Sequence, residues 1–138
     1  MTTRDEYLKQ PVDARLARLA RTADDLAAAI PSHDDTTLSR RPEPKAWSAK
    51  EVVYHLDVER WAEERQYLRN DTVAALDAFR QRRGEALGLL RALTPEQWRR
   101  GGLVPTGARV SFGELGAGSA AHDDTHLAQL ARALDGRP

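Results

Sequence analysis

The stretch that decides the fold is Val12–Ile30, VDARLARLARTADDLAAAI, because its apolar residues recur at every third or fourth position. The recurring positions are Val12, Leu16, Leu19, Ala23, Leu26 and Ile30. This spacing puts them on one face of an α-helix, as is typical of a helix that packs on a core. Pro11 suits the first position of such a helix, and Pro31 ends it. We therefore predict a helix from about Pro11 to Ile30.

Three later segments carry a capping box, in which Ser or Thr is followed three residues on by Glu or Gln. They are Ser48–Glu51, Thr94–Gln97 and Ser111–Glu114. We predict further helices over about 48–69, 73–92, 95–98 and 112–134. Residues 31–47 are predicted to form a long loop, and residues 104–110 a loop or a short extended piece. The helix formers Ala, Leu, Arg and Glu dominate the sequence, so the predicted fold class is all-α.

The composition limits both the architecture and the function. With 138 residues the chain suits one domain, 1–138. Its 21 basic and 21 acidic residues cancel, which argues against a general nucleic-acid binder. The lack of cysteine excludes disulfides, thiolate metal sites and a cysteine nucleophile of the protein's own, and it fits a reducing cytoplasm. No apolar run approaches the ~20 residues that a membrane span needs.

The histidines give the strongest chemical signal. His122 and His126 are four residues apart on the last predicted helix, so their imidazoles share one face, with Cβ atoms ~5–6 Å apart. An inward-facing His55 on the second helix could supply a third nitrogen. Three neutral imidazoles with open positions are typical of a catalytic metal site, where the ion lowers the pKa of a bound water or thiol. The spacing alone leaves ordinary core histidines as the alternative, and His33 is predicted to be a solvated loop residue.

Two segments that contain these histidines resemble one known family. They are Arg41–Leu56, RPEPKAWSAKEVVYHL, and Ala121–Leu130, AHDDTHLAQL. With Leu93–Trp98, they make the chain similar to the DinB-like superfamily over roughly residues 12–134. The resemblance implies an up-down four-helix bundle. It also implies that His55, His122 and His126 are the metal ligands, with zinc or nickel as the divalent ion.

The resemblance further implies a range of activities. Characterised relatives include S-transferases that use low-molecular-weight thiols, others are described as metal-dependent hydrolases, and many are known only as stress-inducible proteins. The leading hypothesis is a metal-dependent S-transferase that takes an external thiol, because the chain has no cysteine. A hydrolase with water as the nucleophile, and a non-catalytic bundle that binds a ligand or metal, are the alternatives. We expect a small-molecule substrate, no nucleic acid or membrane partner, and a bacterial cytoplasmic protein that is either a monomer or a homodimer.

Polar residues near the histidines receive separate predictions. Gln129 and Glu59 could each orient a ligand imidazole, with a solvated helix position as the favoured alternative for Glu59. Asp123 and Asp124 are turned ~100° and ~200° around the helix from His122, so they are predicted to be surface carboxylates that pair with Arg132 or loop arginines.

The large apolar side chains are predicted to pack rather than bind. Trp47 is expected to pin the long loop onto the bundle, and Trp61 to pack beside the His55 helix. Leu68, Phe79, Leu89 and Trp98 are expected to fill the core, with a dimer interface as the alternative.

Overall fold

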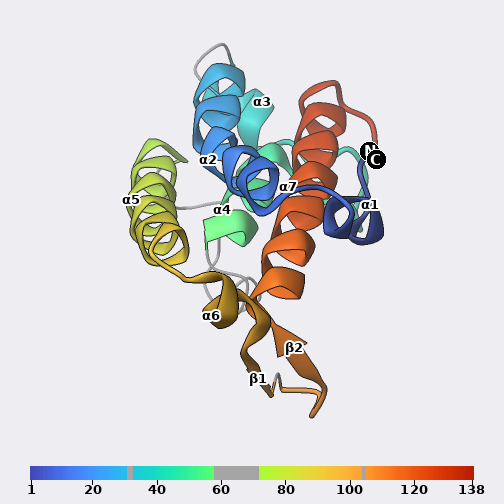
Figure 1. The fold of residues 1–138 in the computed structure, drawn as a ribbon. Helices are drawn as coiled ribbons and strands as arrows, with labels where there is room; N and C mark the ends of the chain where they lie inside the picture. The colour runs from blue at the N-terminus through green and yellow to red at the C-terminus, as the bar shows by residue number, and fades with distance from the viewer. Residues whose placement is uncertain (31–32, 58–71, 104) are drawn as a thin grey trace.

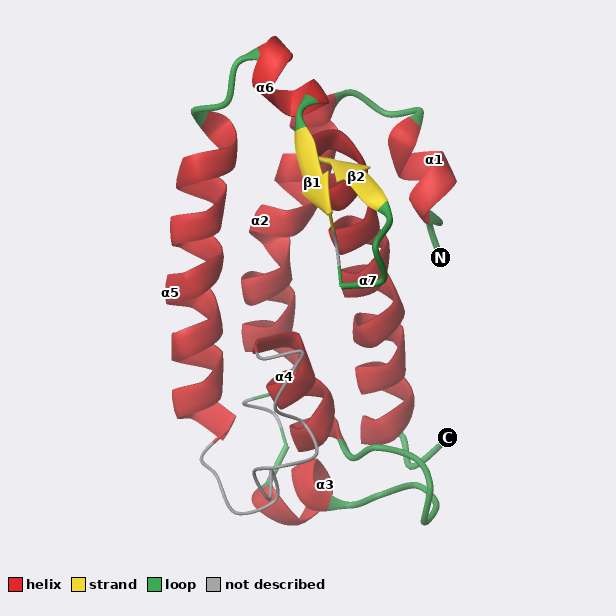
Figure 2. Ribbon diagram, turned by 90° about the horizontal axis from the view of Figure 1, so that it is seen from below, coloured by secondary structure: helices red, strands yellow, loops and turns green. Residues whose placement is uncertain are grey.

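The computed structural model describes residues 1–30, 33–57, 72–103 and 105–138, and its ordered elements are mostly helices (Figure 1). Four helices form the bundle: α2 (Val12–Ala29), α4 (Ala49–Asp57), α5 (Thr72–Arg91) and α7 (Phe112–Leu134). Helices α2, α5 and α7 run side by side (Figure 2). Helices α2 and α4 each pack on both α5 and α7. The all-α prediction and the four-helix bundle are thereby confirmed.

Shorter helices and strands pack around the four-helix bundle. They are α1 (Arg4–Leu8), α3 (Asp35–Ser39), α6 (Pro95–Arg99), β1 (Gly101–Leu103) and β2 (Arg109–Ser111). Helix α1 packs on α7, and the antiparallel β1–β2 hairpin lies with α6 at the end opposite α3 (Figure 2). None of the helices among the described residues is long and apolar enough to cross a membrane.

The capping boxes predicted from the sequence are all formed. Thr94 caps α6 and Ser111 caps α7, each with the reciprocal side-chain contact. Ser48 Oγ accepts from the Glu51 amide at 3.2 Å, and Glu51 Oε2 accepts from the Ser48 amide at 2.9 Å. The predicted start of α4 is therefore confirmed. The part of the predicted helix beyond Asp57, and the boundary at 70–71, lie outside the described residues.

Three elements were not predicted. Helix α1 begins with its own capping box, Thr3–Glu6, and α3 lies inside the stretch predicted to be loop. The glycines at 101 and 102, which follow α6, form β1 together with Leu103. The pairing of Gly101 with Ser111 brings the backbones so close that a Cβ at Gly101 would lie 1.7 Å from the Val110 carbonyl oxygen.

The apolar core has two parts. The first surrounds α4 and includes Leu26, Val52, Val53, Phe79 and Leu130. The second lies toward α1 and α6 and is built from Tyr7, Leu16, Leu19, Leu87, Ala117 and Ala120. The predicted apolar face of α2 contributes to both parts, so the periodicity that predicts this helix also identifies its buried side.

Candidate metal centre

Helix α4 brings His55 to the centre of the bundle. Val52 and Val53, which precede His55, are fully buried and hold α4 against the core. The start of α4 is fixed by Glu51, which accepts hydrogen bonds from Ser48 and ion-pairs with Arg41. Burial alone would raise the pKa of the Glu51 carboxyl, but the hydrogen bonds from Arg41 and Ser48 outweigh it and hold that pKa below its ordinary value.

Helix α7 brings His122 and His126 against His55. The rings of His122 and His126 have centroids 4.3 Å apart, and the His55 ring lies 5.2 Å from the first and 4.4 Å from the second. All three residues are partly buried, and one ring nitrogen from each lies within 4.8 Å of the others. Among the described residues, this is the group of histidine and acidic side chains with the spacing to hold one ion. The structure therefore brings together the three histidines that the sequence singled out.

The donor set fits a divalent ion that prefers nitrogen ligands. His55 Nε2 and His122 Nε2 are 3.2 Å apart. Two nitrogens bound to one tetrahedral zinc at ~2.0–2.1 Å would be about 3.3 Å apart, so this pair needs almost no adjustment. Three imidazoles complete three of four positions of such an ion and leave one for a small molecule.

Gln129 orients the His126 imidazole through a hydrogen bond, as predicted from the sequence. Its Oε1 lies 2.7 Å from His126 Nδ1. Because a carbonyl oxygen only accepts, Nδ1 donates and Nε2 keeps the lone pair with which it can bind a metal. This is the usual arrangement behind a ligating histidine, where an outer partner fixes the tautomer and the ring orientation.

Trp47 forms an aromatic wall beside the histidines. Its ring centroid lies 4.7 Å from that of His55 and 6.1 Å from that of His126, nearly parallel to the latter ring. Trp47 also packs on the first core cluster, as expected of a residue that pins the loop to the bundle. Its contact with two of the three imidazoles was not predicted.

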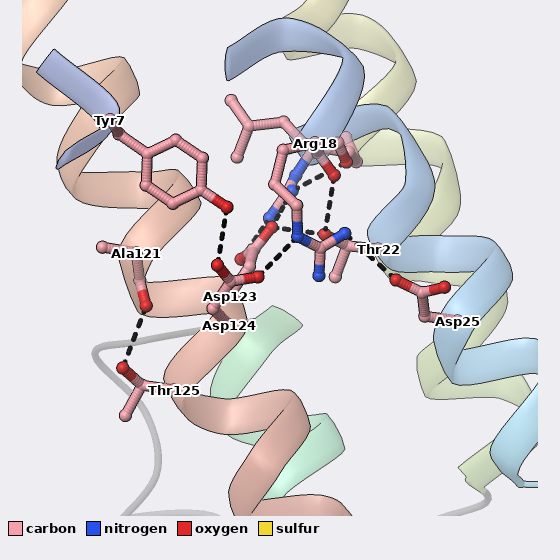
Figure 3. Close-up of polar contacts among 10 residues, drawn as sticks. Tyr7, Arg18, Thr22, Asp25, Ala121, Asp123, Asp124 and Thr125 are labelled. Atoms are coloured by element: carbon pink, nitrogen blue, oxygen red, sulfur yellow. Dashed lines mark hydrogen bonds and ion pairs between the residues drawn. The ribbon is translucent and has the colours of Figure 1, made fainter. Parts of the chain in front are cut away.

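The prediction that Asp123 and Asp124 are surface carboxylates is wrong. Asp123 is 1% exposed and ion-pairs with Arg83 of α5. Asp124 accepts from Tyr7 of α1 and Arg18 of α2 (Figure 3). Neither carboxylate has Arg132 as a partner among these contacts. The predicted directions of the two carboxylates around α7 are correct, but these sides of the helix face neighbouring helices instead of solvent. Only the tertiary arrangement decides that.

The Asp124 contacts change the acidity of their partners. Burial of the Tyr7 phenol, together with its hydrogen bond to Asp124, raises the pKa of that phenol. Burial would lower the pKa of the Arg18 guanidinium, but the hydrogen bond and charge of Asp124, with the charge of Asp25, hold it above its ordinary value. Both shifts favour the protonated forms of Tyr7 and Arg18, which are the forms that donate hydrogen bonds to Asp124.

Other predicted residues have separate outcomes. His33 is half-buried and is not part of the histidine group. Phe79 is buried in the core as predicted, whereas Leu89 is 74% exposed. Glu59, Trp61 and Leu68 lie outside the described residues. Tyr7, Arg18, Thr22 and Arg83, which surround the two aspartates, were not singled out from the sequence, and no local motif marks them.

Comparisons with known proteins agree with this fold. Among solved structures, the chain is similar to YfiT from Bacillus subtilis, with 20% identity and a TM-score of 0.82, over 91% of this chain and 86% of that one. That protein is described as "a probable metal-dependent hydrolase with an unusual four-helix bundle topology". At this identity the likeness concerns the fold. No curated protein matches the chain. The model of the DinB superfamily matches residues 18–130, so the chain belongs to the DinB superfamily.

Proposed function

We propose that the protein binds one divalent metal ion through His55, His122 and His126 and uses it as an enzyme on small molecules. The observation that carries the proposal is the convergence of these three imidazoles from α4 and α7, with one nitrogen of each within 4.8 Å of the others. The description of YfiT, which shares the fold, as a "probable metal-dependent hydrolase" supports it. Zinc and nickel are the ions to test first, because imidazole suits both.

Different residues of the chain would have different roles in such a metal site. Uncharged imidazoles leave the ion its full positive charge, and when bound the ion lowers the pKa of a thiol or water beside it. His126 is held in its ligating tautomer by Gln129. Trp47 covers one side of the histidine group with an apolar surface, which excludes water from that side.

The reaction that we propose is transfer of an external low-molecular-weight thiol to an electrophilic substrate. The chain has no cysteine, so the sulfur must come from outside. The thiol loses its proton, its sulfur forms a bond to the electrophilic carbon, and the leaving group departs with its electron pair and takes up a proton. Hydrolysis, in which water takes the place of the thiol, is the second candidate, and the description of YfiT supports it.

Metal counting tests the site itself. The protein is purified without a histidine tag, and zinc and nickel are measured per chain for the parent, His122→Ala and His33→Ala. We expect about one ion per chain in the parent and in His33→Ala, and a loss in His122→Ala. His33 is the matched control because it lies outside the histidine group. A parent that neither carries an ion nor takes up added zinc or nickel would refute the proposal.

Activity assays separate the reactions. The metal-loaded protein is given electrophilic model substrates with a panel of small thiols, and ester and amide substrates without a thiol. Thiol-dependent turnover that His122→Ala loses supports the transferase. Turnover only in the absence of thiol supports the hydrolase, and stoichiometric metal without turnover in either panel supports a non-catalytic binding protein.

A further inference from the structure

A polar layer crosses the bundle between the two parts of the core. Thr22 of α2 lies between core residues Leu19 and Ala23, and Asp123 of α7 lies between Ala120 and Leu130. Arg83 of α5 completes the layer. Thr22 is fully buried, Asp123 is 1% exposed, and the Arg83 side chain is 16% exposed. The layer therefore lies at the level of His122, the residue before Asp123.

The contacts in this layer join three helices through one carboxylate. Asp123 Oδ2 accepts from the Thr22 hydroxyl at 2.5 Å and from Arg83, and Asp123 Oδ1 accepts from Arg83 Nη2 at 3.1 Å. Arg83 Nη1 also donates to the Leu19 carbonyl of α2 at 3.0 Å. Bidentate pairing fixes the plane of the carboxylate as well as its position. Asp123 is thus held in one geometry by α2 and α5 together.

Apolar packing specifies the rotation of α7 only weakly along the part of the helix before His126. The buried apolar residues there are small, Gly116, Ala117 and Ala120, whereas the larger Leu127, Leu130 and Leu134 pack on the first core cluster after His126. Small side chains form shallow ridges, and shallow ridges allow one helix to turn against its neighbours. The hydrogen bonds of Asp123 do not allow this, because they are directional and buried.

A small turn of α7 would spoil the metal site. Side chains reach ~5–6 Å from a helix axis, so a rotation of about 10° moves a ligand nitrogen by about 1 Å. Metal–ligand distances tolerate only about 0.2 Å. Because Asp123 follows His122 directly, whatever fixes the direction of the carboxylate fixes that of the imidazole, about 100° away around the helix.

We propose that Asp123 is a positioning residue for the metal site, which acts through the Thr22–Asp123–Arg83 layer to hold His122 and His126 toward His55. This inference rests on the proposed function, because it presupposes that the histidines bind an ion. It assigns a role to buried groups that do not touch the ion.

Metal affinity tests the inference without any enzymatic assay. The dissociation constant for Zn(II) is measured by competition with a chromogenic chelator, and the visible absorption of bound Co(II) is recorded as a signature of coordination geometry. The variants are Thr22→Val, which removes the hydroxyl at nearly constant volume, and Asp123→Asn. We expect Zn(II) affinity to fall about 10-fold in Asp123→Asn and less in Thr22→Val, and both Co(II) spectra to change.

Two controls separate positioning from simple loss of stability. Thr22→Ser keeps the hydroxyl and should retain the Zn(II) affinity and Co(II) spectrum of the parent. Leu16→Ala lowers the melting temperature through a cavity in the second core cluster, six residues before Thr22 on α2, and should leave both readouts unchanged. If Asp123→Asn does not fold, Thr22→Val and Thr22→Ser still give the answer.

The outcomes are distinguishable. Parent-like Zn(II) affinity and Co(II) spectra in Thr22→Val and Asp123→Asn would overturn the positioning role and leave the metal site standing. Equal losses in Leu16→Ala would also overturn it, since the effect would then follow stability alone. A parent protein that binds neither ion would overturn the metal site and this inference with it.

Discussion

Replacement of Glu51 by Gln should destabilise the protein at neutral pH and much less in acid. The side chain of Glu51 is 7% exposed, accepts from the Ser48 amide at 2.9 Å and hydroxyl at 3.0 Å, and ion-pairs with Arg41. A glutamine keeps the shape but loses the charge. Hydrogen bonds to charged groups contribute ~1.5–3 kcal/mol when buried, and because Arg41 is 45% exposed we expect a loss of about 1–2 kcal/mol.

The pH dependence of the unfolding free energy is the more specific part of this prediction. The folded pKa of Glu51 is depressed below its ordinary value of 4.5, so its contribution is present above that pH and is lost as pH falls through the folded pKa. The difference in unfolding free energy between parent and Glu51→Gln should therefore be largest near pH 7 and shrink as the pH falls below 4.5.

Urea unfolding from pH 7 to pH 3 measures this difference. Glu114→Gln is a matched control, because Glu114 occupies the same place in the capping box of α7 but is 39% exposed, with a half-exposed Arg4 as its partner. Its effect should be smaller, since solvent screens exposed charges. A parent–variant difference for Glu51→Gln that stays constant over the whole pH range, or that does not exceed the control, would refute the reasoning.

Three further predictions concern the histidine group. Gln129→Leu should weaken Zn(II) binding ~10–100-fold, measured by chelator competition, because His126 loses the partner that fixes its tautomer; an unchanged affinity would contradict this. Co(II) should quench the fluorescence of Trp47, whose ring lies against two of the imidazoles; the quenching should vanish in Trp47→Phe and persist in Trp98→Phe. Chelation of the metal should lower the melting temperature, since an ion at 100 times its dissociation constant contributes ~2.7 kcal/mol; a chelator that shifts parent and His122→Ala equally would contradict a specific site.

The features that could be predicted from the sequence are those that depend only on residues close together in the chain. A capping box needs only four consecutive residues, and the boxes at Ser48, Thr94 and Ser111 all form as predicted. The pairing of His122 with His126 depends on one helical turn, so it follows from the spacing alone. The capping box Thr3–Glu6 at the start of α1 carries the same four-residue signal, so this helix also depends on local information.

What could not be predicted depends on neighbours far along the chain. The burial of Asp123 requires Thr22, 101 residues away, and Arg83, 40 residues away, to converge on one carboxylate. Arg83 lies one helical turn from both Phe79 and Leu87, so its spacing places it on the inward face of α5, but nothing local shows which carboxylate its guanidinium meets. The approach of His55 to the α7 pair was likewise implied by a family resemblance, since the spacing of the residues says nothing about which helices face each other.

The polar layer is better explained by the helix geometry that it specifies than by the stability that it adds. Taking a carboxylate and a guanidinium out of water costs several kcal/mol per ion, and well-packed apolar residues in the same place are often as stable or more so. A bundle selected for stability alone would therefore continue its apolar core across the level of Asp123, as it does above and below. The alanines and glycines before His126 would leave the rotation of that part of α7 loosely determined, whereas the three hydrogen bonds to Asp123, together with those of Asp124, hold one rotation. The layer lies beside the turn of α7 that carries His122 and His126, and if these histidines bind an ion with His55 as proposed, the precise geometry that the layer specifies offsets the cost of burying its charges.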